Sequence, residues 1–204
     1  MGKFLEFVFN RFFLGMLATA FFWLLTLAGG IVFGLAPASA TLMSLYAEHG
    51  YSYRAYNLKE AWGLFKSNFI KSNLAFYSFV LVDLVLVYGL YLLVQLPHQT
   101  IFHLLATFLN ILVVAFVFLA YTVSLKLQVY YELSYRNTVK LALVGIFMSL
   151  PALAKVLFGT VMLIGIGYYM PALLSFVGIG MWHFFISDML EPVYESIHEK
   201  LATK

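Results

Sequence analysis

The chain has 204 residues, of which 63% are hydrophobic and 10% are charged, and its mean hydropathy is +0.93. Soluble domains have about 45–50% apolar and about 25% charged residues, so this composition excludes a water-soluble surface and indicates an integral membrane protein. The absence of cysteine excludes disulfides and thiolate metal sites, and a formal charge of +3 is too small to indicate nucleic-acid binding.

The first uncharged stretch, from Phe12 to Ala47, is long enough for two transmembrane helices. As a single helix it would be about 54 Å long, whereas the hydrocarbon core of a bilayer is about 30 Å thick. Gly29 and Gly30 lie near its middle, so we predict a helix at 10–28, a tight turn and a second helix at 31–48. The second segment is less apolar than a typical span, and a re-entrant segment is the alternative.

A basic and aromatic segment at about 54–72 precedes the next apolar run. Its aromatic and basic side chains recur at helical spacing, which is typical of an amphipathic helix that lies in the headgroup layer. Plain anchoring in that layer is the simpler interpretation, and a docking surface for a membrane or cytoplasmic partner is the more specific one. The residues predicted for this surface are Lys59, Trp62, Phe65, Lys66 and Phe69.

The rest of the chain predicts two further helical hairpins and a short tail. Turn-forming residues at 97–100 divide one apolar run, and two glycines with Pro171 divide the next. The predicted helices are 73–95 and 101–125 in the second hairpin and 139–165 and 171–188 in the third, followed by an acidic tail at about 189–204. The predicted fold class for residues 1–204 is therefore a single all-α transmembrane domain, a bundle of about six helices in three antiparallel hairpins.

The basic residues are distributed unevenly over the two sides of this six-helix arrangement. The three turns on one side have none, and the other side has Lys3, Arg11, Arg54, Lys59, Lys66, Lys71, Lys126, Arg136, Lys140, Lys200 and Lys204. Loops rich in Lys and Arg face the cytoplasm, so both termini are predicted to lie inside. A five-helix arrangement would place the basic 54–71 segment outside, and the charge distribution therefore favours six helices.

The first half of the chain has a distinctive order of segments, namely FGLAPASATLMSLYAEHG, then EAWGLFKSNFIKSN, then an apolar helix. This order resembles the YesL family of bacterial membrane proteins, whose function is unknown, over residues 10–95. The residues that match the family pattern are Gly34, Pro37, Ala38, Phe65, Asn68, Phe69 and Asn73, and structural roles are expected for them. Members of the family tend to be encoded beside sugar importers and glycoside hydrolases, so the resemblance implies a role in carbohydrate uptake at the bacterial cytoplasmic membrane.

Two ionisable residues fall inside predicted spans. Asp83 lies about 14 Å into the helix at 73–95, where an unpaired carboxylate is energetically expensive. Lys155, in the helix at 139–165, is the candidate partner. A direct pair requires this helix to start late or to bend at Pro151, and the open alternatives are a structural pair, separate satisfaction of each charge, or a solute or proton pathway.

No enzyme or cofactor motif is present in the sequence, and no metal site is predicted. His98 and His103 are spaced by five residues, which is poor for a shared metal on one helical face, and His183 is expected to be interfacial. Glu195 and His198 form a single Glu-x-x-His motif, whereas carboxylate-bridged di-iron sites need two.

We therefore expect a non-catalytic accessory or assembly subunit of a bacterial carbohydrate ABC importer. Its expected partners are the lipid bilayer and the permease subunits of the importer, with no cofactor and no nucleic acid. The alternative is a stand-alone small-solute carrier or channel that uses Asp83 and Lys155.

Overall fold

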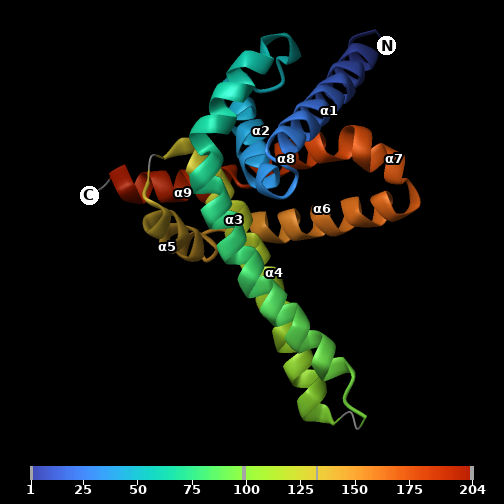
Figure 1. Ribbon diagram of the computed structural model, residues 1–204, viewed down its shortest axis with the longest axis vertical. Coiled ribbons are helices and arrows are strands. Elements are labelled where there is room, and N and C mark those ends of the chain that lie inside the picture. The colour runs from blue at the N-terminus through green and yellow to red at the C-terminus, as the bar shows by residue number, and fades with distance from the viewer. Residues whose placement is uncertain (1, 98–99, 132, 203–204) are drawn as a thin grey trace.

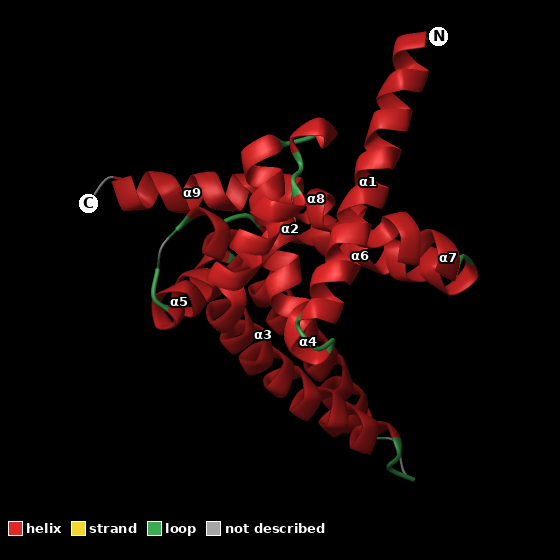
Figure 2. Cartoon of the chain, turned by 45° about the horizontal axis from the view of Figure 1, so that its top comes forward, coloured by secondary structure: helices red, strands yellow, loops and turns green. Residues whose placement is uncertain are grey.

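The computed structural model describes residues 2–97, 100–131 and 133–202 of the chain (Figures 1 and 2). Within these residues all regular elements are helical, as the sequence predicts. The segments that are long and apolar enough to cross a membrane are Leu5–Ala28, Leu58–Val94, Ile101–Tyr130, Leu150–Tyr169 and Pro171–Met189. These apolar helices support the predicted membrane protein and its bilayer environment.

The helices follow one another with short connections. They are α1 (Gly2–Ala28), α2 (Leu35–His49), α3 (Leu58–Val94), α4 (Ile101–Tyr130), α5 (Tyr135–Gly145), α6 (Leu150–Tyr169), α7 (Pro171–Leu173), α8 (Ile179–Met189) and α9 (Glu191–Ala202). Two 3₁₀ turns, η1 (Val32–Gly34) and η2 (Tyr53–Ala55), flank α2, and a π-helical segment, η3 (Leu174–Gly178), joins α7 to α8.

Two hydrophobic cores lie side by side and share α2, α3 and α8. One core joins α1, α2 and the start of α3, and its members include Leu14, Leu42 and Phe65. The other joins α2, α3, α4, α5, α6 and α9. Phe184 of α8 belongs to the first core and Ile186 of the same helix to the second, so α8 fixes the two halves of the protein to one another.

The turn between α1 and α2 forms where the sequence predicts it. Gly30 has a φ of +75° and Ile31 has a φ of +63°, so the chain reverses within two residues. The predicted second helix at 31–48 begins later, at Leu35, because the 3₁₀ turn continues the reversal. At about 22 Å, α2 is shorter than the hydrocarbon core and most of its residues are buried, so five helices rather than six have spanning length.

Helix α3 is a single continuous helix of 37 residues. The predicted start of this transmembrane helix at 73 is therefore wrong, because most of the segment predicted to be amphipathic, at 54–72, continues into the apolar part without a helix-breaking residue. With α4, α3 forms a hairpin that extends away from the rest of the chain (Figure 1). Its outer part exposes apolar side chains such as Val85, Ile101 and Phe102, which are 65%, 78% and 78% exposed.

The predicted helix at 139–165 is divided into α5 and α6. Pro151 lies in the first turn of α6, where its missing N–H group is tolerated, whereas its ring would clash with a preceding helical turn. Ser149 accordingly takes a non-helical conformation, with φ −148° and ψ 75°. Helix α6 thus starts late, as a pair between Lys155 and Asp83 would require.

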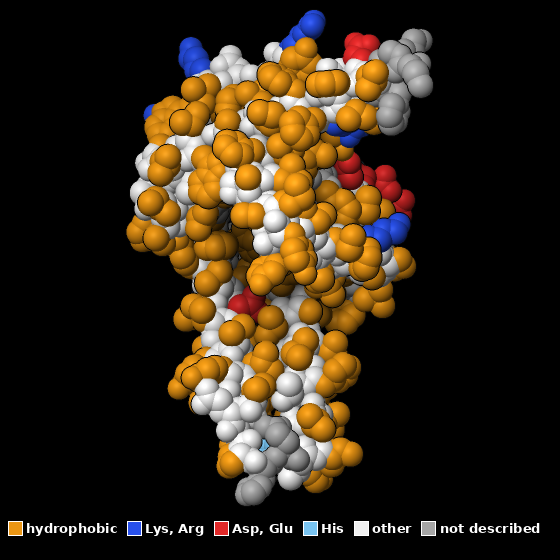
Figure 3. Space-filling model, turned by 90° about the vertical axis from the view of Figure 1, so that its right-hand side faces the viewer, with side chains coloured by type: hydrophobic (Ala, Val, Ile, Leu, Met, Phe, Trp, Pro, Cys, Tyr) orange, Lys and Arg blue, Asp and Glu red, His pale blue; other side chains and the backbone are white. Residues whose placement is uncertain are grey.

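The predicted tail at 189–204 is also more structured than expected, because it folds as the amphipathic helix α9. Val193 and Ile197 are each 1% exposed and pack in the core next to Gly145. Figure 3 shows one face of the molecule, on which hydrophobic side chains continue to the tip of the α3–α4 hairpin while all visible Lys and Arg side chains lie in the upper half.

Candidate functional site

The first turns of α3 present a basic aromatic face, which we define as Lys59, Trp62 and Lys66. Asn57 caps the helix, since its side chain accepts a hydrogen bond from the Lys59 N–H group at 2.9 Å. The Lys66 ammonium lies 5.1 Å from the centre of the Trp62 ring, a cation–π arrangement. Trp62 is 40% exposed, so the face offers a partner one large ring between two positive charges.

The two phenylalanines predicted for the same surface point inward instead. Phe65 is 3% exposed and belongs to the core of α1 and α2, and Phe69 packs against that core. The Phe65 ring stacks on Trp62 with centres 5.5 Å apart, so buried residues hold the exposed ring in place. Of the five predicted docking residues, three are therefore accessible to a partner, and the two phenylalanines pack against the core.

Two of the residues that match the family pattern, Gly34 and Asn73, shape the α1–α2 turn. A side chain at Gly34 would collide with the backbone of Thr26, because a Cβ there would lie 2.2 Å from the Thr26 carbonyl oxygen. The Asn73 amide of α3 donates to the Phe33 carbonyl at 2.9 Å, and Tyr77 donates to a neighbouring carbonyl of the turn at 2.6 Å. These contacts explain structural roles for Gly34 and Asn73.

Pro37 and Asn68, which also match the family pattern, lie away from this turn. Pro37 lies in the first turn of α2 and is buried. Asn68 lines a polar cavity of about 580 Å³ between α2, α3 and the end of α4. Ser44 and Gln128 line the same cavity from the opposite side.

Lys126 is buried, although the sequence pattern predicts it among the surface charges. Its buried position is the main feature that the sequence did not predict. Lys126 of α4 is 2% exposed, and its ammonium donates to the Glu191 carboxylate at 2.6 Å and to the Ser187 carbonyl at 2.7 Å. Ser187 lies in the last turn of α8, whose carbonyl groups lack helical partners. Lys126 therefore caps α8 and fixes the start of α9 with one charge.

Asp188, next in the chain, holds two phenols on the same end of the bundle. The Tyr46 hydroxyl donates to one carboxylate oxygen at 2.5 Å and the Tyr51 hydroxyl donates to the other at 2.8 Å. The Arg11 guanidinium lies over the Tyr51 ring. Burial raises the pKa of Tyr51, and its hydrogen bond to the Asp188 carboxylate acts in the same direction. These bonds tie α1, α2 and α8 together.

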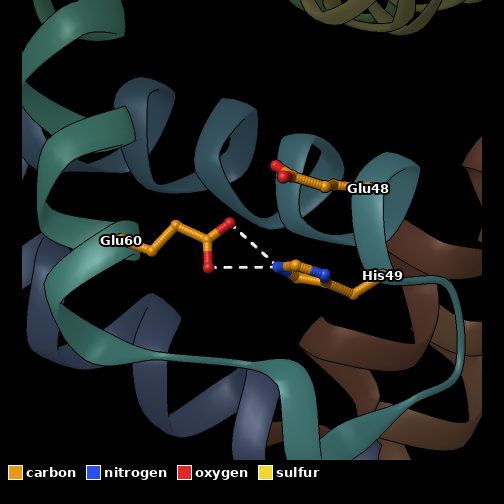
Figure 4. A group of neighbouring side chains, drawn as sticks. All are labelled: Glu48, His49 and Glu60. Atoms are coloured by element: carbon orange, nitrogen blue, oxygen red, sulfur yellow. Dashed lines mark hydrogen bonds and ion pairs between the residues drawn. The ribbon is translucent and has the colours of Figure 1, made fainter.

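The end of α2 and the start of α3 bring together a histidine and two carboxylates (Figure 4). The Nε2 atom of His49 lies 2.9 and 3.0 Å from the two Glu60 oxygens, and Glu48 projects from the adjacent position on α2. Their ligand atoms lie within 4.8 Å of one another, so these residue types could hold a divalent cation. The His49 and Glu60 side chains also contact one another directly at hydrogen-bond distance, so no cation is needed to hold them together.

Glu191 and His198 of the tail have different partners. His198 interacts through Nδ1 with the Tyr131 hydroxyl at 3.1 Å, whereas Glu191 binds Lys126. His183 was expected to be interfacial, but it is 2% exposed and its Nδ1 bonds the Ile179 carbonyl at 2.7 Å.

Of the two outer histidines, the structure describes His103. His103 belongs to the cap of α4, where its Nδ1 accepts from the Thr100 N–H group at 3.1 Å. His98 lies outside the described residues.

The structure does not bring Asp83 and Lys155 together. Both salt bridges in the described part of the chain involve other residues. One oxygen of Asp83 is buried without a hydrogen-bond partner, and Lys155 lies exposed on α6. Neither residue lines the polar cavity at the end of α4.

Comparison with known protein families gives one match. Residues 16–90 match the family described as "Protein of unknown function, DUF624". This range covers the second half of α1, all of α2 and nearly all of α3, and it overlaps the residues on which the resemblance to the YesL family rests. No curated protein and no solved structure matches the chain.

Proposed function

We propose that this protein is a non-catalytic accessory or assembly subunit of a carbohydrate ABC importer in the bacterial cytoplasmic membrane. The observation that carries the proposal is the basic aromatic face on α3. Tryptophan is enriched at interface centres, and the charges of Lys59 and Lys66 flank this exposed ring as a polar rim. The buried Phe65 stacks on the ring and holds it in place before a partner arrives.

The resemblance to the YesL family supplies the class of partner, because sugar importers are the usual genomic neighbours of that family. Permease subunits of such importers lie in the same membrane, and they have loops at the cytoplasmic surface. We place both termini and the basic aromatic face on that surface, since Lys and Arg residues accumulate on the cytoplasmic side.

The carrier alternative has less support. A carrier of polar solutes needs a polar cavity that its intramembrane charges can reach. Asp83 and Lys155 form no pair, and the polar cavity near Asn68 lies at the end of α4, lined by neither of them. We therefore assign these two charges to assembly rather than to transport.

Purification of the tagged full-length chain in a mild detergent tests the proposal. We expect the permease subunits of the importer to co-purify, and deletion of the gene to reduce uptake of the sugar. Lys59→Glu with Lys66→Glu should abolish co-purification, whereas Arg136→Glu with Lys140→Glu on α5 is the matched charge control. A chain that stays alone, in cells whose sugar uptake is unchanged without it, contradicts the proposal.

A further inference from the structure

An apolar cavity of about 360 Å³ lies where α1, α2, α4, α6 and α8 approach one another. Phe22, Phe118, Leu163 and Leu174 line it with aromatic and aliphatic side chains from four different elements. An apolar cavity of about 150 Å³ is large enough to bind benzene, so this one can accept a larger molecule. Ligand sites in proteins are typically apolar cavities of this kind with a few polar groups in their walls.

Four side chains with polar atoms line the cavity, and three of them are hydrogen-bonded to other parts of the chain. The Ser39 and Thr160 hydroxyls each donate to a carbonyl of their own helix, at 3.0 and 2.8 Å, and the Trp182 ring N–H donates to the Thr160 hydroxyl at 3.0 Å. The fourth is His183, which is 2% exposed. Within the described residues its Nε2 atom is buried and has no hydrogen-bond partner. A buried polar atom without a partner is costly, so this nitrogen requires a partner from outside the chain.

The hydrogen bond of the other ring nitrogen determines which chemistry suits Nε2. The Nδ1 atom of His183 lies 2.7 Å from the Ile179 carbonyl oxygen, which can only accept, so Nδ1 carries the proton. None of the described residues that line the cavity is acidic, so nothing there stabilises a charged imidazolium and the ring is neutral. The Nε2 atom of this tautomer has a lone pair and points away from the Ile179 carbonyl. The missing partner is therefore a hydrogen-bond donor.

The cavity extends to the outer surface of α6, where a ligand can enter. Ile164 lines the cavity and is 64% exposed, and α6 is one of the helices long and apolar enough to cross a membrane. A molecule dissolved in lipid reaches this opening directly, whereas a charged solute would have to leave water first. The π-helical segment η3 adjoins the cavity, since Leu174 at its start and Ile179 just after its end both line the wall. Local π-helical turns occur frequently at functional sites.

We propose that this cavity binds a lipid-soluble alcohol, a molecule with an apolar chain and one hydroxyl group. The chain contacts the apolar wall, and the hydroxyl donates a hydrogen bond to Nε2 of His183. An ether of the same shape cannot donate and leaves the buried nitrogen unpaired, so the site discriminates against it. The basic aromatic face contributes none of the lining residues, so this site and the proposed contact with the importer can be tested separately.

Tryptophan fluorescence in nanodiscs tests the proposal, because Trp182 lines the cavity. The full-length chain with Trp23→Phe and Trp62→Phe retains Trp182 as its only tryptophan. The probes are a long-chain alcohol with a terminal bromine, which quenches a nearby indole ring, and the methyl ether of the same alcohol. We expect the alcohol to quench Trp182 in a saturable manner and to bind at least about tenfold more tightly than the ether, because only the alcohol supplies a donor.

A histidine variant assigns this preference to one nitrogen. His183→Phe keeps an aromatic ring and removes the acceptor, so both probes should then bind with equal affinity. His103→Phe, in the cap at the other end of α4, is the matched control and should leave the preference for the alcohol unchanged. The comparison of the two probes on the chain that retains His183 stands even if His183→Phe does not fold. Quenching that never saturates, or equal affinities for the alcohol and the ether on that chain, would overturn the proposal.

Discussion

The Lys126–Glu191 pair predicts a marked asymmetry between its two partners. Glu191→Ala leaves the ammonium of Lys126, which is 2% exposed, with only the carbonyl and hydroxyl of Ser187, and an uncompensated buried charge costs about 3 kcal/mol. Lys126→Met leaves a carboxylate that is 44% exposed and can be hydrated. Its main loss is the hydrogen bond to the Ser187 carbonyl, about 1 kcal/mol.

The free energy of unfolding in mixed micelles measures this asymmetry, with tryptophan fluorescence as the readout. The double variant should be about as stable as Lys126→Met alone, because once the ammonium is removed Glu191 has no buried charge to compensate. Additive losses in the double variant, or a larger loss for Lys126→Met than for Glu191→Ala, would refute the account of Lys126 as a buried charge held by its partners.

Two further predictions concern Gly34, at the turn between α1 and α2, and Tyr51, which follows α2. Gly34→Ala pushes a methyl group into the backbone of α1 and should lower the unfolding free energy by about 3 kcal/mol, whereas Gly63→Ala, in open space within α3, should raise it by about 0.5–1 kcal/mol; equal effects on the melting temperature would contradict this. The raised pKa of Tyr51 means that stability is fully present below the ordinary tyrosine pKa of 10.0 and is lost as the pH rises through the raised value. The melting temperature should therefore stay constant up to about pH 10 and then fall, and Tyr51→Phe should make that fall shallower, whereas an unchanged slope would exclude Tyr51 as its source.

The sequence predicted the helical class and the turns because these depend on local residues. Gly29 and Gly30 mark a reversal that the structure forms with positive φ values at Gly30 and Ile31. The continuity of α3 was not predicted, because an amphipathic segment and an apolar segment can share one helical axis when no Gly-Pro pair divides them. Conversely, Pro151 was read as a possible bend, whereas its ring ends α5 and starts a new helix.

The polar contacts between the end of α4 and the start of α9 could not be predicted from local patterns. Lys126 and Glu191 are 65 residues apart, and a lysine at the end of an apolar run is more often hydrated than buried. The signal that could have indicated burial was the polar run from Ser124 to Gln128 at the end of an apolar helix. The burial of Phe65 could not be predicted either. Helical spacing shows which residues share a face of the helix, but it does not show whether that face packs against the core.

The side of the membrane on which the basic aromatic face lies decides the central claim most directly. In intact cells, a membrane-impermeant maleimide should label Thr100→Cys at the hairpin turn and should label Lys59→Cys only after the membrane is permeabilised. Labelling of Lys59→Cys in intact cells, with Thr100→Cys protected, would place the face outside and remove the proposed contact with the importer.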